Sequence, residues 1–274
     1  MKHLNDIDVL VLGLGVSGLA MARWCARHGA RVRVWDSRDV APGDAALAET
    51  LPAAQRLRGE LSDEAFAGVK LILKSPGLAP ADARIAAPLA RAADSGILVQ
   101  GELELFARAL ADLKEERGYA PRLLAITGTN GKTTTTAMTA LLVERAGRRA
   151  AVAGNIMPTM LDRLMAMLDG PRDAWVQVWV LELSSFQLAD AQAFEPTAAA
   201  VLNLTQDHLD WHGSMAAYAG AKARLFAMQS AGHVAVIAQD DEPSRTIAAH
   251  VPGRLVAVSA DAIDPAVQAR WPAR

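Results

Sequence analysis

The sequence predicts an α/β protein of two domains, and three features support this prediction. The chain has 274 residues, which at about 150 residues per domain corresponds to about two domains. Short apolar runs alternate along it with helix-forming stretches, the pattern of βαβ units in parallel sheets. Two of these runs end in glycine clusters that open a helix, over residues 13–18 and 128–131. We therefore expect a ligand loop in each half of the chain.

The first domain is predicted over residues 1–100 as a Rossmann-like domain. An apolar strand leads through the glycine turn into a helix over Leu19–His28, and a second strand with period-two alternation follows, which makes a βαβ unit. The predicted strands of this domain cover residues 8–12, 30–36, 69–73 and 96–100.

The second domain is predicted over residues 101–274 as a P-loop NTPase-like α/β domain. Its first strand runs directly into the second glycine cluster, and a helix then continues to about Ala146. The charged stretch Asp112–Gly118, close to Pro121, is expected to be a loop near the junction of the two domains. The predicted strands cover residues 122–127, 150–153, 175–183, 198–204, 234–238 and 254–259.

Composition narrows the class of protein. Hydrophobic residues make up 51% of the chain and charged residues 21%, as in ordinary globular proteins. The net charge of −2 gives no basic field that would favour nucleic acid. Cys25 is the single cysteine and lies in an apolar helical run, so we expect it in the core and the chain in a reducing compartment. The uncharged run Val9–Ala22 is too short to span a bilayer. We therefore expect a monomeric cytoplasmic protein, without membrane insertion.

The first glycine cluster, Gly13-x-Gly15-x-x-Gly18, places backbone N–H groups at the start of a helix, where they can hold a pyrophosphate. Asp36 ends the next strand, at the spacing of an acid that binds a ribose hydroxyl. These residues alone leave three interpretations open: the NAD site of a dehydrogenase, a site for a nucleotide-linked substrate, and a tight structural turn.

The second cluster departs from the ordinary phosphate loop G-x-x-x-x-G-K-[ST], because Ile126 stands six residues before Lys132. The shorter pattern Gly128-x-x-Gly131-Lys132-Thr133 still lies between a strand and a helix. Its glycines let the backbone curl round phosphate oxygens, the lysine neutralises them and the threonine offers a hydroxyl to Mg²⁺. The cluster predicts a nucleoside triphosphate site.

Three residues further along are candidates for metal or phosphate chemistry. Glu182 ends an apolar strand, at the edge where ligands gather, and is either a Mg²⁺ ligand or a solvated strand end. His208 lies in a loop rich in acids and imidazoles over residues 203–212, and is either a ligand of a metal or phosphate or inert. Composition alone makes Lys222 a surface lysine.

Taken in order, nine motifs resemble those of the Mur ligases, ATP-dependent enzymes of peptidoglycan precursor synthesis. The resemblance runs from about residue 8 to about residue 240 and implies a part in cell wall biogenesis, and so in cell shape, cell division and the cell cycle. The motifs are residues 13–18, 36–38, 74–77, 101–106, 127–134, 154–155, 181–187, 203–210 and 221–226.

In this family the first domain holds the UDP of the substrate and not NAD. The resemblance implies substrate contacts near the pyrophosphate and the uracil, and further contacts in the second domain. The residues implied for these contacts are Val16, Ser17, Asp36, Ser37, Arg38, Ser75, Gly77, Asn155, Ser184 and Gln187. It implies ATP contacts from Gly128, Thr129, Asn130, Gly131, Lys132, Thr133, Thr134 and Thr135. It implies Mg²⁺ ligands at Thr133, Glu182, His208 and Lys222, the last carried as a carbamate. Catalytic roles would fall to Lys132, Glu182, His208 and Lys222.

The implied reaction joins D-glutamate to UDP-N-acetylmuramoyl-L-alanine, with ATP and Mg²⁺ as cofactors. The γ-phosphoryl group of ATP passes to the L-alanyl carboxylate to give an acyl phosphate, which the amine of D-glutamate then attacks. Because two anions must approach each other, Lys132 and Mg²⁺ are expected to screen their repulsion.

The sequence departs from the family in one respect. These ligases carry a third, C-terminal domain, and no further glycine loop or α/β block follows Ser259, so we expect that domain to be absent and the central domain to be incomplete. The alternative to a ligase is therefore a non-catalytic module that binds the UDP-sugar, and ATP as a further ligand. A ligase that adds another amino acid is a lesser alternative. Folylpolyglutamate synthase is less favoured, since it lacks the UDP-binding domain.

Overall fold

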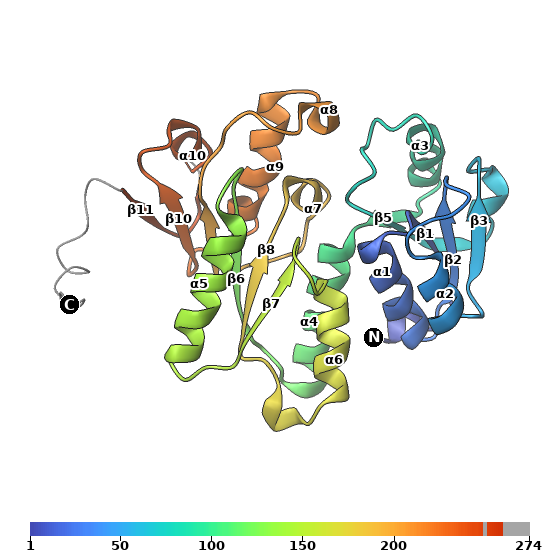
Figure 1. Cartoon of the computed structure of the whole chain (residues 1–274), viewed down its shortest axis with the longest axis horizontal. Coiled ribbons are helices and arrows are strands. Elements are labelled where there is room, and N and C mark those ends of the chain that lie inside the picture. The colour runs from blue at the N-terminus through green and yellow to red at the C-terminus, as the bar shows by residue number, and fades with distance from the viewer. Residues whose placement is uncertain (249–250, 260–274) are drawn as a thin grey trace.

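The structure is a computed structural model that describes residues 1–248 and 251–259, and within these residues it contains two parallel β-sheets side by side (Figure 1). The first sheet has the strand order β3-β2-β1-β4-β5, and the second has the order β11-β10-β9-β6-β8-β7. Every strand pair in both sheets is parallel. The predicted α/β fold class, with a Rossmann-like domain followed by a P-loop NTPase-like one, is confirmed.

The first sheet alternates strands with helices in chain order. Its strands are β1 (Asp8–Leu12), β2 (Arg31–Asp36), β3 (Gln55–Arg58), β4 (Val69–Lys74) and β5 (Leu98–Gln100). Its helices are α1 (Val16–Arg27), α2 (Asp44–Thr50) and α3 (Ala86–Asp94), with 3₁₀ turns at Lys2–Leu4 and Asp63–Phe66. Since parallel strands need crossover connections, the glycine turn after β1 and the loops after β2 and β4 all leave the sheet at its carboxyl edge.

The second sheet follows the same plan. Its strands are β6 (Arg122–Thr127), β7 (Ala150–Gly154), β8 (Val178–Glu182), β9 (Ala198–Val201), β10 (Val234–Ala238) and β11 (Arg254–Val258). Its helices are α4 (Glu102–Arg117), α5 (Lys132–Arg145), α6 (Met160–Asp169), α7 (Ser185–Ala189), α8 (Leu209–His212), α9 (Met215–Ala227) and α10 (Glu242–Ile247), with a 3₁₀ turn at Arg172–Ala174. The phosphate loop, Glu182 and the 203–212 loop therefore leave this sheet at its carboxyl edge.

One apolar core joins the two domains. Helix α1 on the first sheet faces α4 and α6 on the second, and Trp24, Phe106 and Leu164 are fully buried in the cluster that these helices share (Figure 1). Cys25 belongs to the same cluster, which confirms its predicted place in the core, and burial raises the pKa of its thiol to about 12. The shared core fixes the two carboxyl edges relative to each other, because close-packed helices resist sliding.

Two sequence predictions in this region were wrong. The stretch Asp112–Gly118 is the end of α4 and not a loop, because Leu110 and Leu113 continue a buried stripe while the charged residues 114–117 face solvent. The helix ends at Gly118, whose left-handed backbone forms the cap. Strand β3 was missed because its sequence, Gln-Arg-Leu-Arg, is polar, as an edge strand with little burial allows.

The glycine turn after β1 depends on close backbone approach. Gly13 adopts a positive φ of 89°, and a Cβ at Gly18 would lie 1.8 Å from the Gly13 carbonyl oxygen. The Leu14 N–H donates to the Asp36 carboxylate at 2.8 Å, which holds the turn against the end of β2. The turn is therefore a tight structural device as well as a candidate ligand loop.

Among residues 1–248 and 251–259, no helix is long and apolar enough to cross a bilayer.

We predict that Gly18→Ala destabilises the protein by about 2 kcal/mol or more, because the new methyl group must displace the backbone of the glycine turn. Urea unfolding measures the change. Gly15→Ala is the matched control, since a Cβ there meets nothing within 4 Å and the backbone of Gly15 is extended. An equal loss in both variants would contradict the packing argument.

Candidate functional site

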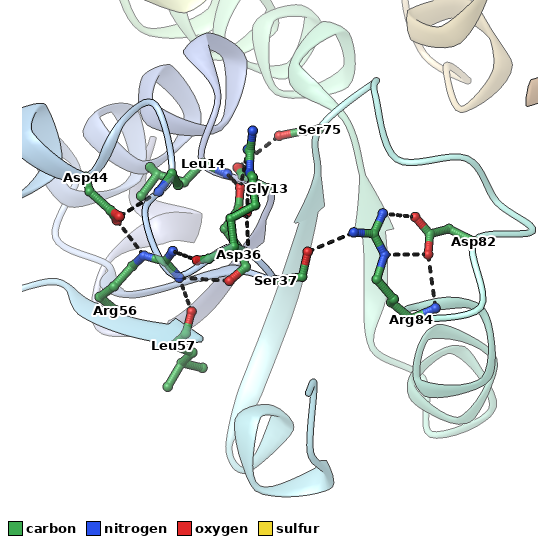
Figure 2. A network of polar contacts seen from close by, with 12 residues as sticks. Gly13, Leu14, Asp36, Ser37, Asp44, Arg56, Leu57, Ser75, Asp82 and Arg84 are labelled. Carbon is green, nitrogen blue, oxygen red and sulfur yellow. Dashed lines mark hydrogen bonds and ion pairs between the residues drawn. The ribbon is translucent and has the colours of Figure 1, made fainter. Parts of the chain in front are cut away.

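A cavity of about 500 Å³ opens at the carboxyl edge of the first sheet. It gathers every candidate that sequence reasoning placed in this domain, from three loops that are far apart along the chain. Figure 2 shows Asp36 and Ser37 after β2, with Ser75 after β4 and the Gly13 turn beside them. The cavity is lined by Gly13, Gly15, Val16, Ser17, Trp35, Asp36, Ser37, Arg38, Ser75, Pro76, Gly77, Leu78 and Arg84.

Asp36 is the most tightly held side chain of this cavity. Its carboxylate accepts hydrogen bonds from the Leu14 N–H at 2.8 Å and from the Arg38 N–H at 3.1 Å. The Arg38 guanidinium donates to both carboxylate oxygens, at 2.8 and 2.6 Å. This guanidinium holds the pKa of Asp36 well below its usual range, against the effect of burial. Asp36 is therefore an anion that orders the turn and places Arg38 at the cavity mouth.

Arg84 is a cavity residue that sequence reasoning missed. Its guanidinium donates to the Ser37 hydroxyl at 2.8 Å and pairs with Asp82, so that it faces the β2 loop from the β4 loop (Figure 2). The pair with Asp82 raises the pKa of Arg84 further. The loop before α3 carries no motif, and only the fold brings this charge to the cavity. Arg38 and Arg84 thus both line the cavity, and each is paired with an aspartate.

In the second domain the phosphate loop folds round its own lysine. Gly128 and Gly131 have positive φ values of 154° and 81°, which favour glycine, and Gly131 caps the start of α5. The Lys132 ammonium donates to the Gly128 carbonyl at 3.1 Å and to the Thr129 carbonyl at 2.8 Å. The Asn203 side chain accepts from the Asn130 N–H at 2.8 Å and donates to the Asn130 carbonyl at 3.1 Å. The loop thus presents a lysine and a helix N-terminus together, which favours an anion.

Glu182 lies buried at the end of β8, with only 2% of its surface exposed. One carboxylate oxygen accepts from the Thr133 hydroxyl at 2.8 Å and the other accepts from the Asn155 amide at 3.0 Å. The structure therefore brings together two predicted Mg²⁺ ligands and one predicted substrate contact. A hydroxyl and a carboxylate are hard oxygen donors, so this pair fits Mg²⁺. The solvated strand end that sequence reasoning left open does not fit this burial.

Lys222 is buried and not the surface lysine that composition suggests, with 2% of its surface exposed on α9. Its ammonium donates to the Thr127 hydroxyl at 3.2 Å and to the Gly128 carbonyl at 2.9 Å, under the phosphate loop. Burial, with a smaller effect from Lys132, lowers its pKa to about 7. No acid pairs with it among the described residues, so a large share of Lys222 is a neutral amine near neutral pH.

His208 does not join Glu182 and Thr133. It has a positive φ of 53°, its side chain is partly exposed, and its ring contacts Asp207 at 3.3 Å and Phe186 at 4.7 Å between ring centres. In the described part of the chain no three His, Cys, Asp or Glu side chains come close enough to form a metal site. The protein side chains thus supply an incomplete ligand set of oxygen donors.

The remaining candidates lie at helix starts. Ser184 and Gln187 form a reciprocal cap on α7, in which the Ser184 hydroxyl accepts from the Gln187 N–H at 3.2 Å and the Gln187 side chain accepts from the Ser184 N–H at 3.0 Å. Thr134 and Thr135 lie in the first turn of α5, next to the phosphate loop. These positions keep all four residues at the carboxyl edge of the second sheet.

Comparison with known families and proteins matches both domains. Residues 7–101 match the N-terminal domain of MurD-like Mur ligases, and residues 126–269 match the Mur ligase middle domain. UDP-N-acetylmuramoylalanine--D-glutamate ligase of Ralstonia nicotianae is 56% identical over 233 residues, which are 85% of this chain and 46% of that protein. The protein of the same name from Albidiferax ferrireducens is 58% identical over 82% of this chain and 44% of its own length. The chain spans about half the length of these relatives.

Solved structures show the same fold. A UDP-N-acetylmuramate:L-alanyl-gamma-D-glutamyl-meso-diaminopimelate ligase from Neisseria meningitides superposes with a TM-score of 0.58 at 16% identity, over 92% of this chain and 78% of that one. A murein peptide ligase from Psychrobacter arcticus gives a TM-score of 0.53 at 18% identity, over 91% of this chain and 52% of that one. At these identities the likeness concerns the fold alone.

The lowered pKa of Lys222 predicts a pH dependence of stability. Between about pH 7 and its ordinary pKa of 10.5, the unfolded chain binds a proton at Lys222 that the folded chain does not. The free energy of unfolding should therefore rise with pH across this range. In Lys222→Met this rise should be smaller by on the order of 3 kcal/mol. Urea unfolding at pH 6.5, 8 and 9.5 measures it. The exposed Lys114 is the control, and equal pH profiles for Lys222→Met and the wild type would contradict the assignment.

Proposed function

The chain belongs to the Mur ligase family, and we propose that it carries the acceptor-binding and ATP-binding parts of a ligase that joins D-glutamate to UDP-N-acetylmuramoyl-L-alanine. One observation carries the proposal. Buried Glu182, with the Thr133 hydroxyl and the Asn155 amide bonded to its carboxylate, lies beside a phosphate loop, in a chain whose first domain has a separate cavity lined by two arginines. Such a chain can hold a nucleotide-linked acceptor and a nucleoside triphosphate at once. The relatives that bear this activity as their name support the choice of amino acid.

We assign residues 1–100 to the acceptor and residues 101–274 to ATP. In the first domain Val16 and Ser17 would meet the pyrophosphate of UDP, and the loop 36–38 would meet the uracil. Ser75 and Gly77 would line the far wall, with the acyl end of the acceptor directed to Asn155 and Glu182. The proposed reaction is cytoplasmic, where ATP and nucleotide-linked sugars are available.

In the second domain Lys132 has the position to neutralise the phosphates of ATP. The backbone N–H groups of the loop 128–133 and the N-terminus of α5 would bind phosphate oxygens. In the proposed reaction the L-alanyl carboxylate attacks the γ-phosphorus, the bond to ADP breaks, and an acyl phosphate forms. The amine of D-glutamate then attacks the acyl carbon, losing a proton, and phosphate leaves as the amide forms.

Thr133 and Glu182 are the residues that would hold Mg²⁺, since they place hydroxyl and carboxylate oxygens 2.8 Å apart. When bound there, Mg²⁺ would supply Lewis acidity and screen the charge of two anions that must meet. Burial of Glu182 keeps bulk water from its carboxylate, and this strengthens the contacts that the carboxylate itself makes.

For Lys222 we propose a carbamate. A neutral amine adds CO₂ and loses a proton to give a carbamate anion, which turns a buried cation into an oxygen donor. The lowered pKa of about 7 and the position under the phosphate loop support this step. With His208 from the 203–212 loop, the carbamate would complete the oxygen and nitrogen donors of a second Mg²⁺ site.

The other candidate function is a module that binds the UDP-sugar, and ATP as a further ligand, without turnover. The experiment that separates the two is calorimetry of the 274-residue chain with UDP-N-acetylmuramoyl-L-alanine and with Mg²⁺–ATP, followed by an assay of ADP release. Binding of both, with ADP release that needs D-glutamate, supports the ligase. Binding without ADP release supports the module, and failure to bind the UDP-sugar would contradict both.

Lys132→Ala should lower the rate of D-glutamate-dependent ADP release by about a hundredfold or more, because a positioned charge next to the transferred phosphoryl group is lost. In a chain that only binds, the same change should weaken affinity for Mg²⁺–ATP and leave affinity for the UDP-sugar unchanged. Lys114→Ala, on the exposed face of α4, is the control for general loss of charge. An unchanged ATP affinity and rate in Lys132→Ala would contradict the phosphate-loop assignment.

Arg84→Ala should weaken binding of UDP by about tenfold, because a charged hydrogen-bond donor of the cavity lining and the support of Ser37 are both lost. Isothermal titration with UDP measures the change without any need for turnover. Arg91→Ala removes an exposed arginine that pairs with Asp63 outside the cavity, and it should leave the affinity unchanged. Equal affinities in the two variants would show that Arg84 does not face the ligand.

A further inference from the structure

Lys74 is a buried lysine that the proposed reaction does not use. It ends β4, directly before the turn 75–78 that lines the acceptor cavity, and only 3% of its surface is exposed. A buried cation is costly unless it is paired and hydrogen-bonded, so its partners indicate what it is for.

The partners of Lys74 lie in both domains. In the first domain its ammonium donates to the Leu78 carbonyl at 2.9 Å, which closes the turn 75–78 on itself. In the second domain it forms an ion pair with Asp190 at 2.8 Å, at the end of α7. It also lies 5.5 Å from the ring centre of Trp211 in α8, within the range of a cation–π contact. One ammonium thus ties the wall of the acceptor cavity to two elements of the ATP-binding domain.

The second-domain partners are themselves held firmly. Glu104 on α4 accepts hydrogen bonds from the N–H groups of Gln192 and Ala193, at 2.8 and 3.0 Å. The Arg224 guanidinium donates to the Ala191 carbonyl, from a position on α9 two residues after Lys222. The turn 190–193 is therefore held in place by hydrogen bonds to α4 and α9. A shift of Lys74 would move this turn and, through Arg224, α9.

Trp211 makes the second connection. Its ring packs on Phe186 with 4.7 Å between ring centres, and Phe186 packs in turn on His208 at 4.7 Å. The backbone N–H of Trp211 donates to the backbone carbonyl of His208 at 3.1 Å. Lys74 therefore touches the same aromatic cluster that positions His208.

We propose that Lys74 is a positioning residue that couples occupancy of the acceptor cavity to the order of the 203–212 loop. This inference rests on the proposed function, because it takes the cavity to bind a UDP-sugar. A ligand that orders the turn 75–78 fixes Lys74, and Lys74 then holds Asp190 and Trp211 in one arrangement. By linkage, the state of the loop must affect the acceptor cavity to the same degree.

Asp190→Asn is the decisive variant. It removes the charge across the domain boundary but leaves the bond from Lys74 to Leu78, so the cavity itself stays intact. The measurement is hydrogen exchange of the 203–212 segment in the 274-residue chain, with and without UDP-N-acetylmuramoyl-L-alanine. In the wild type the ligand should slow exchange by at least about fivefold, which is the lower limit of ordinary coupling between sites. In Asp190→Asn it should slow exchange by less than about twofold. Affinity of Asp190→Asn for the UDP-sugar, measured by calorimetry, should fall only by the factor that coupled the ligand to the loop in the wild type.

Asp169→Asn is the matched control. Asp169 also pairs with an arginine across the domain boundary, Arg27 at 2.6 Å, but this pair joins the carboxyl ends of α1 and α6, away from the cavity. This variant should keep the ligand-induced slowing, whereas Lys74→Met should lose it and also bind the UDP-sugar more weakly.

The outcomes separate this inference from the proposed function. A wild-type chain that does not bind the UDP-sugar overturns both. A chain that binds it, with equal slowing in the wild type and Asp190→Asn, overturns the role of Lys74 alone. Equal loss in Asp169→Asn and Asp190→Asn would also overturn it, because the effect would then be a general loosening of the domain boundary.

Discussion

Parallel pairing of the strands is the constraint on which the site depends. In a parallel sheet every crossover connection returns the chain to the edge where the strands begin. The carboxyl ends of all strands therefore lie together at the opposite edge. This brings the end of β8, the start of α5 and the end of β7 together, although Glu182, Thr133 and Asn155 are far apart in the chain. The same geometry gathers the cavity of the first domain. Two sets of loops that are far apart in the chain thereby gather into two candidate sites.

The apolar core between the sheets holds the two candidate sites in one arrangement. Helices α1, α4 and α6 share a buried cluster, which holds the two carboxyl edges in a fixed relation. Glu102, at the start of α4, is buried in this boundary and accepts from the Leu161 N–H at 3.0 Å, and burial raises its pKa to about 7. Such polar contacts set the angle at which apolar helices pack, while the apolar area supplies most of the stability. In the proposed function, this arrangement lets an acceptor held by one domain present its reactive end to the other.

The fold, the first glycine turn and Asp36 could be predicted from the sequence because their signals are local, whereas the other cavity residues were predicted only through the resemblance to the Mur ligases. Apolar runs that end in glycines specify strand and turn directly, and Asp36 follows at a fixed spacing. Burial of Lys222 could not be predicted, since its neighbours in sequence are ordinary helix residues and its partners, Thr127 and Gly128, are about 95 positions away. Arg84 was missed for the same reason. The charged end of α4 was read as a loop because its buried stripe is narrow and its solvent face is strongly polar.

A crystal structure of the chain with UDP-N-acetylmuramoyl-L-alanine and a non-hydrolysable ATP analogue tests the account most directly. We expect UDP in the first-domain cavity between the loops 36–38 and 75–78, triphosphate on the loop 128–133, and the L-alanyl carboxylate directed to Asn155 and Glu182. UDP bound in the second domain, or a carboxylate directed away from the phosphate loop, would contradict it.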